Sequence, residues 1–128
     1  MGCTPVFNLE IQFESEQDVY DFWEEKGKPY VESKYGELTE TELDFGVFGE
    51  ISDDSTRDTI LVRYLDDYDE YVGNYGNGHS IVFHHKPYYD QRIFKLEPAL
   101  EILKDLKNGL KGDDRIVALR FYTSAATI

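Results

Sequence analysis

The sequence predicts an α+β domain in which a single, mostly antiparallel sheet of about five strands carries two helices packed on one face. Five segments alternate apolar and polar residues with the period of a strand, and two segments place apolar residues at helical spacing. The resulting order is β-α-β-β-β-α-β. A length of 128 residues and a hydrophobic content of 41% suit one compact acidic domain over residues 1–128.

The first strand and the first helix are expected in the first thirty residues. Residues 6–13 alternate cleanly, which is typical of a half-buried strand. A helix should begin at Ser15, whose side chain can cap a backbone amide, and end at Gly27. Because proline lacks an amide hydrogen, Pro29 should prevent the helix from continuing, and residues 30–41 should form a connection.

Three strands are expected in the middle of the chain. They are predicted over 42–51, 59–65 and 79–85, where alternation or β-branched and aromatic content returns. Gly46 and Gly49 indicate a bulge or a close backbone contact in the first of them.

The remaining segments are a loop, a helix and a strand. Residues 66–78 read as a loop because glycine and asparagine are frequent there. The second helix should begin at Pro98 and end at Gly109 and Gly112. The last strand, 115–122, contains a continuous apolar run that favours a central position covered on both faces. Strands linked by a helix could then lie parallel to one another.

The inward positions of these elements predict the hydrophobic core. Residues expected to be buried together are Phe7, Leu9, Ile11, Phe22, Trp23, Phe45, Val47, Leu103, Leu106, Val117 and Leu119.

The charge of the chain is regional. The formal net charge is -13, and residues 10–70 hold 20 acidic and 5 basic residues, a net of -15. Residues 71–128 hold 6 acidic and 8 basic residues, a net of +2. Such a field repels nucleic acid and anionic membranes and attracts basic surfaces. With one cysteine and no visible signal peptide or membrane-spanning run, we expect a cytoplasmic protein.

The residues that could support catalysis or metal binding do not form a recognisable motif. His79 and His85 share one face of their strand but lie about 20 Å apart at the rise of a strand, and His84 faces the other way. The acidic clusters lack the spacing of a calcium loop, and the glycine-rich segment 73–78 lacks the lysine of a phosphate loop. We therefore expect no cofactor, no metal and no catalytic residue.

Tyrosines interleaved with carboxylates give the remaining signal for function. Tyrosine offers a large contact area at low entropic cost, and neighbouring carboxylates would meet Arg or Lys on a partner. The expected partner-binding residues are Glu42, Asp44, Glu50, Asp53, Asp54, Asp66, Asp67, Tyr68, Asp69, Glu70, Tyr71 and Tyr75. A solvated loop whose tyrosines pack on the sheet is the alternative interpretation.

These observations favour a non-catalytic acidic protein that blocks the basic surface of a partner. The charge favours a nuclease or another nucleic-acid-binding protein as that partner. One setting is a phage or mobile-element inhibitor of a host defence nuclease, acting as a nucleic-acid mimic. Another is an immunity protein that neutralises a cognate nuclease toxin. A small enzyme using His84 or His85 with carboxylates, and an assembly protein whose charge serves solubility, remain as alternatives.

Overall fold

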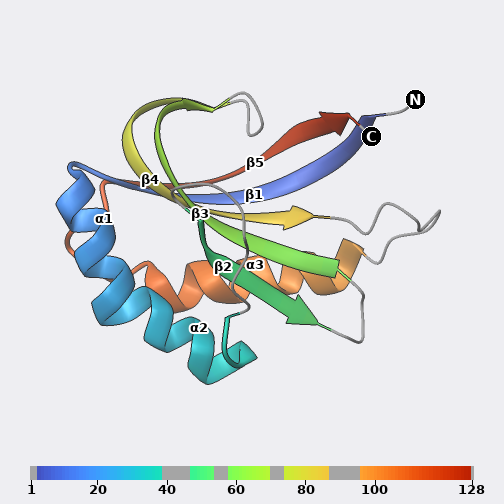
Figure 1. Ribbon diagram of the computed structural model, residues 1–128, viewed down its shortest axis with the longest axis horizontal. Coiled ribbons are helices and arrows are strands. Elements are labelled where there is room, and N and C mark those ends of the chain that lie inside the picture. The colour runs from blue at the N-terminus through green and yellow to red at the C-terminus, as the bar shows by residue number, and fades with distance from the viewer. Residues whose placement is uncertain (1–2, 39–46, 54–57, 70–73, 87–95, 128) are drawn as a thin grey trace.

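The computed structural model describes residues 3–38, 47–53, 58–69, 74–86 and 96–127 (Figure 1). These residues form five strands and two helical regions, which confirms the predicted α+β class. The strands are β1 (Cys3–Phe13), β2 (Val47–Asp53), β3 (Asp58–Asp69), β4 (Asn74–Lys86) and β5 (Ala118–Thr127). They make one sheet in the order β2-β3-β4-β1-β5, and every neighbouring pair is antiparallel.

The helices lie together on one side of this sheet (Figure 1). They are α1 (Glu16–Phe22), the π-helical turn η1 (Trp23–Gly27), α2 (Lys28–Tyr35) and α3 (Leu96–Leu110). The expectation that helix-linked strands lie parallel holds for β4 and β5, which are both antiparallel to β1, the strand between them. It is wrong for β1 and β2, which run in opposite directions and are separated by β3 and β4. Apart from β2, the order and connections are those of a split β-α-β arrangement, which hosts many unrelated functions and so carries no functional argument.

The core lies between the sheet and the helices, as the periodicity predicts. Of the residues expected there, six are buried and two are partly buried against the same cluster. The buried ones are Leu9, Ile11, Phe22, Trp23, Leu103 and Leu106, and the partly buried ones are Phe7 and Leu119. Phe45 lies outside the described residues, as does the side chain of Val47.

The first helical region is longer than predicted. Gly27 and Pro29 do not end it, and the helix runs on to Tyr35. The predicted connection over 30–41 is therefore wrong for its first six residues. The residue that does end the helix is Gly36, whose φ of 86° lies in the left-handed region that glycine tolerates best.

A wide turn explains why Pro29 does not break the helix. In η1 the amide of Lys28 donates to the carbonyl of Trp23, five residues back. Pro29 then falls in the first turn of α2, where a missing amide hydrogen costs least. Gly27 has a packing role here, because an added Cβ would lie 2.6 Å from a ring carbon of Trp23.

The predicted loop over 66–78 is largely a hairpin. β3 runs to Asp69 and β4 begins at Asn74, and Tyr68 pairs with Tyr75 across the ladder. The register shifts between Asp66 and Tyr68, which marks a bulge. The aromatic and β-branched content of the two strands outweighs the turn signals of Gly76 and Gly78, which lie within β4.

The position predicted for the last strand is also wrong. β5 is an edge strand, since among the described strands it pairs only with β1. Val117, expected in the core, is 58% exposed. Ile116 and Leu119 are partly buried on the helix side. Ile116 and Val117 precede the strand, which begins at Ala118. The continuous apolar run therefore does not mark a strand that is buried on both faces.

The bulge predicted around Gly46 and Gly49 is present at the second glycine. The pairing of β2 with β3 shifts register between Val47 and Gly49, and Gly49 has a φ of 147°. The shift accompanies the inward placement of Phe48, whose ring stacks on Trp23 at 4.8 Å between centroids.

Candidate functional site

A stripe of acidic and aromatic side chains follows the outer side of α1 and continues onto η1. Ser15 begins the helix, and its hydroxyl oxygen accepts a hydrogen bond from the amide of Asp18 at 3.1 Å. Residues four apart lie on the same side of a helix, so Glu16, Tyr20 and Glu24 form one row. All three are exposed, and Tyr20 keeps 38% of its surface open to solvent.

The ring of Tyr20 connects this row to the sheet. Its centroid lies 5.8 Å from that of Phe48 on β2 and 5.6 Å from that of Tyr64 on β3. The Tyr64 hydroxyl is 2.6 Å from Nδ1 of His79 on β4, and the two rings are parallel. We call Glu16, Tyr20, Glu24, Tyr64 and His79 the Tyr20 surface.

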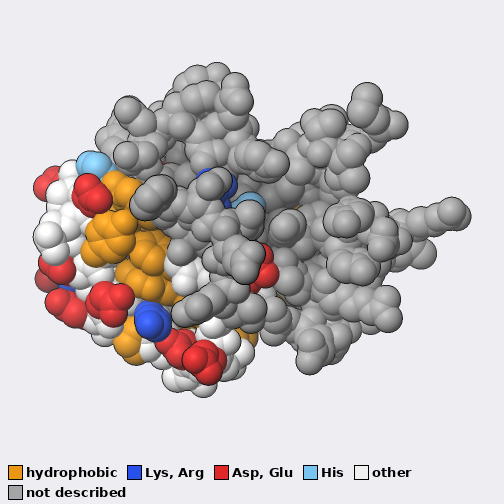
Figure 2. All heavy atoms as spheres, viewed as in Figure 1, with side chains coloured by type: hydrophobic (Ala, Val, Ile, Leu, Met, Phe, Trp, Pro, Cys, Tyr) orange, Lys and Arg blue, Asp and Glu red, His pale blue; other side chains and the backbone are white. Residues whose placement is uncertain are grey.

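The described part of the face drawn in Figure 2 also combines exposed hydrophobic side chains with acidic ones. Figure 2 shows hydrophobic side chains exposed at the surface with acidic side chains around them. A large aromatic side chain bordered by carboxylates is a typical contact for a basic, arginine-rich surface, because the guanidinium can both stack on the ring and pair with the acids.

Several other carboxylates of the helical layer are already in ion pairs. Asp113 lies 3.1 Å from Nζ of Lys26 and 2.9 Å from Nε of Arg115, and Arg115 also contacts Glu25 at 3.0 Å. The hydrogen bonds from Arg115, opposed by burial and assisted by Lys26, hold the pKa of Asp113 well below its usual value. Asp113, whose side chain is nearly buried, therefore stabilises this part of the fold rather than facing a partner.

Glu16 and Glu24 differ from that group. Within the described ranges they are exposed and have no ion pair. Residues 14–38 hold 8 acidic and 3 basic residues, so the whole first helical region carries a net charge of -5. The stripe is thus an acidic surface with carboxylates free to pair with cations.

The structure distributes the predicted site residues along the sheet. Glu50 is half-buried on β2 opposite Leu61, so it lies about 16 Å along the ladder from Asp66 at the rise of a strand. Asp53 closes the far end of the β2–β3 pair. Asp66, Asp67, Tyr68, Asp69 and Tyr75 fall on the β3–β4 hairpin, where the structure describes the backbone alone. Glu42, Asp44, Asp54, Glu70 and Tyr71 lie outside the described residues.

The strand β3 links the predicted residues to the Tyr20 surface. Tyr64 and Asp66 are two positions apart on β3, and Asp66 pairs with His79 across the ladder. Along the chain, the backbone positions of the hairpin acids therefore come shortly after Tyr64, whose ring contacts Tyr20. The contribution of α1 to this surface was missed from the sequence, although the spacing of Glu16, Tyr20 and Glu24 contained the signal.

A second polar group lies on the sheet face turned away from the helices. Glu10 is fully buried there and pairs with Arg120, its cross-strand neighbour on β5. Asn8 and His84 are also buried, and they are opposite one another in the register of β1 and β4. His84 occupies the diagonal position from Glu10, about 7 Å between Cβ atoms in such a ladder. The sequence indicated only that His84 would face away from the core.

The described residues contain no group of three or more His, Cys, Asp or Glu side chains able to hold a metal ion. Within the same ranges no helix is long and apolar enough to cross a membrane. Comparisons with protein-family models, with curated proteins and with solved structures find no match for this chain.

Proposed function

We propose that this protein is a non-catalytic acidic binding protein that covers a basic surface of a partner protein, one that handles nucleic acid. The observation that supports this most is the Tyr20 surface, where an exposed ring stands between two carboxylates without ion pairs among the described residues. The backbone of β3 continues from Tyr64 to Asp66, Asp67 and Asp69, three further acidic residues.

Electrostatics favours a basic partner over a neutral one. Like charges gathered on one region repel one another, so the clustering lowers the stability of the isolated protein. A surface rich in Arg and Lys relieves that repulsion and accelerates association. Spaced carboxylates also resemble the phosphates of a nucleic acid, which would let the protein compete with nucleic acid for its partner. An inhibitor of a host defence nuclease and an immunity protein against a nuclease toxin both use this chemistry.

The test is a charge reversal with a matched control. Glu16→Lys with Glu24→Lys should abolish capture of the partner from a native host extract, and Tyr20→Ala should weaken it. Glu37→Lys with Glu101→Lys changes the net charge equally at two exposed positions away from this surface, and should retain the partner. Equal loss in both double variants would show a general charge effect and refute a specific surface.

A second candidate function is proton transfer by His84 and Glu10. Its support is the burial of the Glu10 carboxylate and the His84 ring on one face of the sheet, where the exposed Arg120 pairs with Glu10. Glu10→Gln and His84→Ala would then each reduce a catalysed rate by orders of magnitude while the protein stays folded. Under the binding function, both variants keep the partner.

A further inference from the structure

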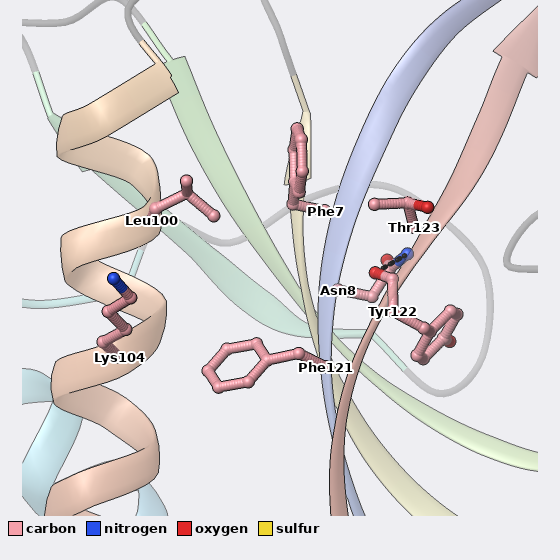
Figure 3. A pocket seen from close by; sticks show the side chains of 7 residues that line it. All are labelled: Phe7, Asn8, Leu100, Lys104, Phe121, Tyr122 and Thr123. Carbon is pink, nitrogen blue, oxygen red and sulfur yellow. Dashed lines mark hydrogen bonds between the residues drawn. The ribbon is translucent and has the colours of Figure 1, made fainter.

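A pocket of about 200 Å³ lies between α3 and the neighbouring strands β1 and β5, away from the Tyr20 surface (Figure 3). It is lined by Phe7, Asn8, Leu100, Lys104, Phe121, Tyr122 and Thr123. In Figure 3, Leu100 and Lys104 on α3 face Phe7 and Phe121 on the strands.

The pocket exists because α3 covers the sheet unevenly. Leu103, Leu106 and Leu110 of this helix are buried in the core. Leu100, near the start of α3, is only half-buried. Phe121 stays 42% exposed, although the alternation of β5 places it with Leu119 on the helix side. The apolar walls of the pocket are therefore open to solvent.

The charged side chains around this pocket are basic. Lys104 is one helical turn after Leu100, and Nζ of Lys107 lies 5.3 Å from the centroid of the Phe121 ring. None of the described residues that line it carries a carboxylate. Within the described ranges neither lysine forms an ion pair, whereas Lys26, Lys34, Arg115 and Arg120 all do. In a protein with a net charge of -13, these two lysines give the pocket a locally basic margin.

The size of the pocket limits the apolar part of a ligand. A cavity of about 150 Å³ lined by aliphatic and aromatic side chains accommodates benzene. A volume of about 200 Å³ therefore leaves room for one substituted ring. Small-molecule sites commonly combine such apolar walls with one or two polar groups that fix orientation.

We propose that this pocket binds a small aromatic monocarboxylate. Its ring packs among Phe7, Leu100 and Phe121, and its carboxylate accepts a charge-assisted hydrogen bond from Nζ of Lys104. The contribution of Lys107 is long-range attraction, because its ammonium group lies over the ring of Phe121.

The experiment is a titration of the full chain followed by NMR amide shifts, with phenylacetate as the probe and phenylacetamide as its neutral counterpart. Phenylacetate should give saturable shifts centred on Phe7, Leu100 and Phe121, with an affinity about tenfold higher than that of the amide. Lys104→Gln should remove this difference, and Lys111→Gln, an exposed lysine past the end of α3, should leave it unchanged.

Two results would overturn the proposal. One is the absence of saturable shifts at the pocket residues with phenylacetate. The other is equal affinity for phenylacetate and phenylacetamide in the unmodified protein, which would leave no role for the lysines.

Discussion

The hydroxyl of Tyr35 donates a hydrogen bond to Oδ2 of Asp105 at 2.5 Å, joining the end of α2 to α3 across 70 residues of sequence. Tyr30 donates to Oδ1 of the same carboxylate at 3.2 Å. Nζ of Lys34 lies 3.9 Å from Oδ1 of Asp105. One carboxylate therefore connects the two helical regions that cover the sheet.

Tyr35→Phe should lower the free energy of unfolding by about 1 kcal/mol, because it removes a hydrogen bond to a charged acceptor in a partly exposed setting. Tyr20→Phe is the control, since no hydrogen bond of the Tyr20 hydroxyl is found among the described residues. Urea denaturation of both variants measures the difference. Equal destabilisation would contradict the role given to Asp105.

The same variant should change the alkaline limit of stability. Burial, and then the hydrogen bond to Asp105, raise the pKa of Tyr35 above its ordinary value. An unfolded tyrosine loses its proton near pH 10, whereas folded Tyr35 keeps it, so stability should fall as the pH rises above about 10. Tyr35→Phe should show a shallower fall over that range in unfolding experiments.

Gly109→Ala should destabilise the protein by about 2 kcal/mol, although alanine is the better helix former. The reason is contact, because an added Cβ would lie 2.1 Å from the Cζ atom of Tyr30. Gly112→Ala is the matched control, since nothing lies within 4 Å of its Cβ position. In a Tyr30→Ala background the effect of Gly109→Ala should disappear. Persistence of the full effect there would refute the contact.

These glycines show what sequence patterns can and cannot predict. Glycine near the end of a helical pattern reads as a terminator, and Gly27 and Gly109 were both interpreted in that way. Gly27 lies within a continuing helical region, whereas α3 does end at Leu110, directly after Gly109. Each glycine also allows the close approach of a ring, Trp23 in one case and Tyr30 in the other. Such contacts depend on the packing of segments far apart in sequence, which local periodicity does not specify.

The elements with strong periodicity were predictable. Leu9, Ile11, Phe22 and Leu103 are buried as their spacing indicates, and Ser15 caps α1. Strand order was not predictable, because alternation specifies a buried face but not a neighbour. For that reason β5 was placed in the centre of the sheet.

The candidate site was only partly accessible from sequence. The mixture of tyrosine and acid was recognised on the hairpin around Tyr68, but not on α1 around Tyr20. The two segments are brought together by the contact of Tyr20 with Tyr64, 44 positions later in the chain. Similarly, Glu10 pairs with Arg120, which lies 110 residues away in the sequence, and no local motif predicts this pairing.

Asp113→Asn should reduce stability most at neutral pH and progressively less in acid. The Arg115 hydrogen bonds keep the pKa of Asp113 low, so its contribution is present above the unfolded pKa near 3.9 and is lost as the pH falls through the folded pKa. Thermal unfolding of the wild-type protein and the variant between pH 6 and pH 2 measures how the difference in stability between them decreases. Asp114→Asn, at the exposed neighbouring residue, serves as the control. A difference in stability that stays constant across this pH range would contradict the ion-pair explanation.

His84→Ala and His85→Ala should leave partner binding within a few-fold of the wild-type value. His84 is on the sheet face opposite the core and away from the Tyr20 surface, so its loss affects packing with Asn8 before it affects binding. Binding measured together with thermal unfolding separates the two effects. A loss by orders of magnitude in a folded variant would instead favour the catalytic function.

The acidic surface is tested most directly by reversing the hairpin charges. Asp66, Asp67, Asp69 and Glu70 are changed together to Lys, and capture of the partner from a native host extract is measured at low and high salt. Binding through desolvated carboxylates predicts that the wild-type protein holds its partner at low salt and releases it at high salt, and that the reversed protein, still folded by circular dichroism, captures none. If the charge serves solubility alone, the reversed protein would capture the same partner with the same salt dependence, and that result would contradict an acidic binding surface.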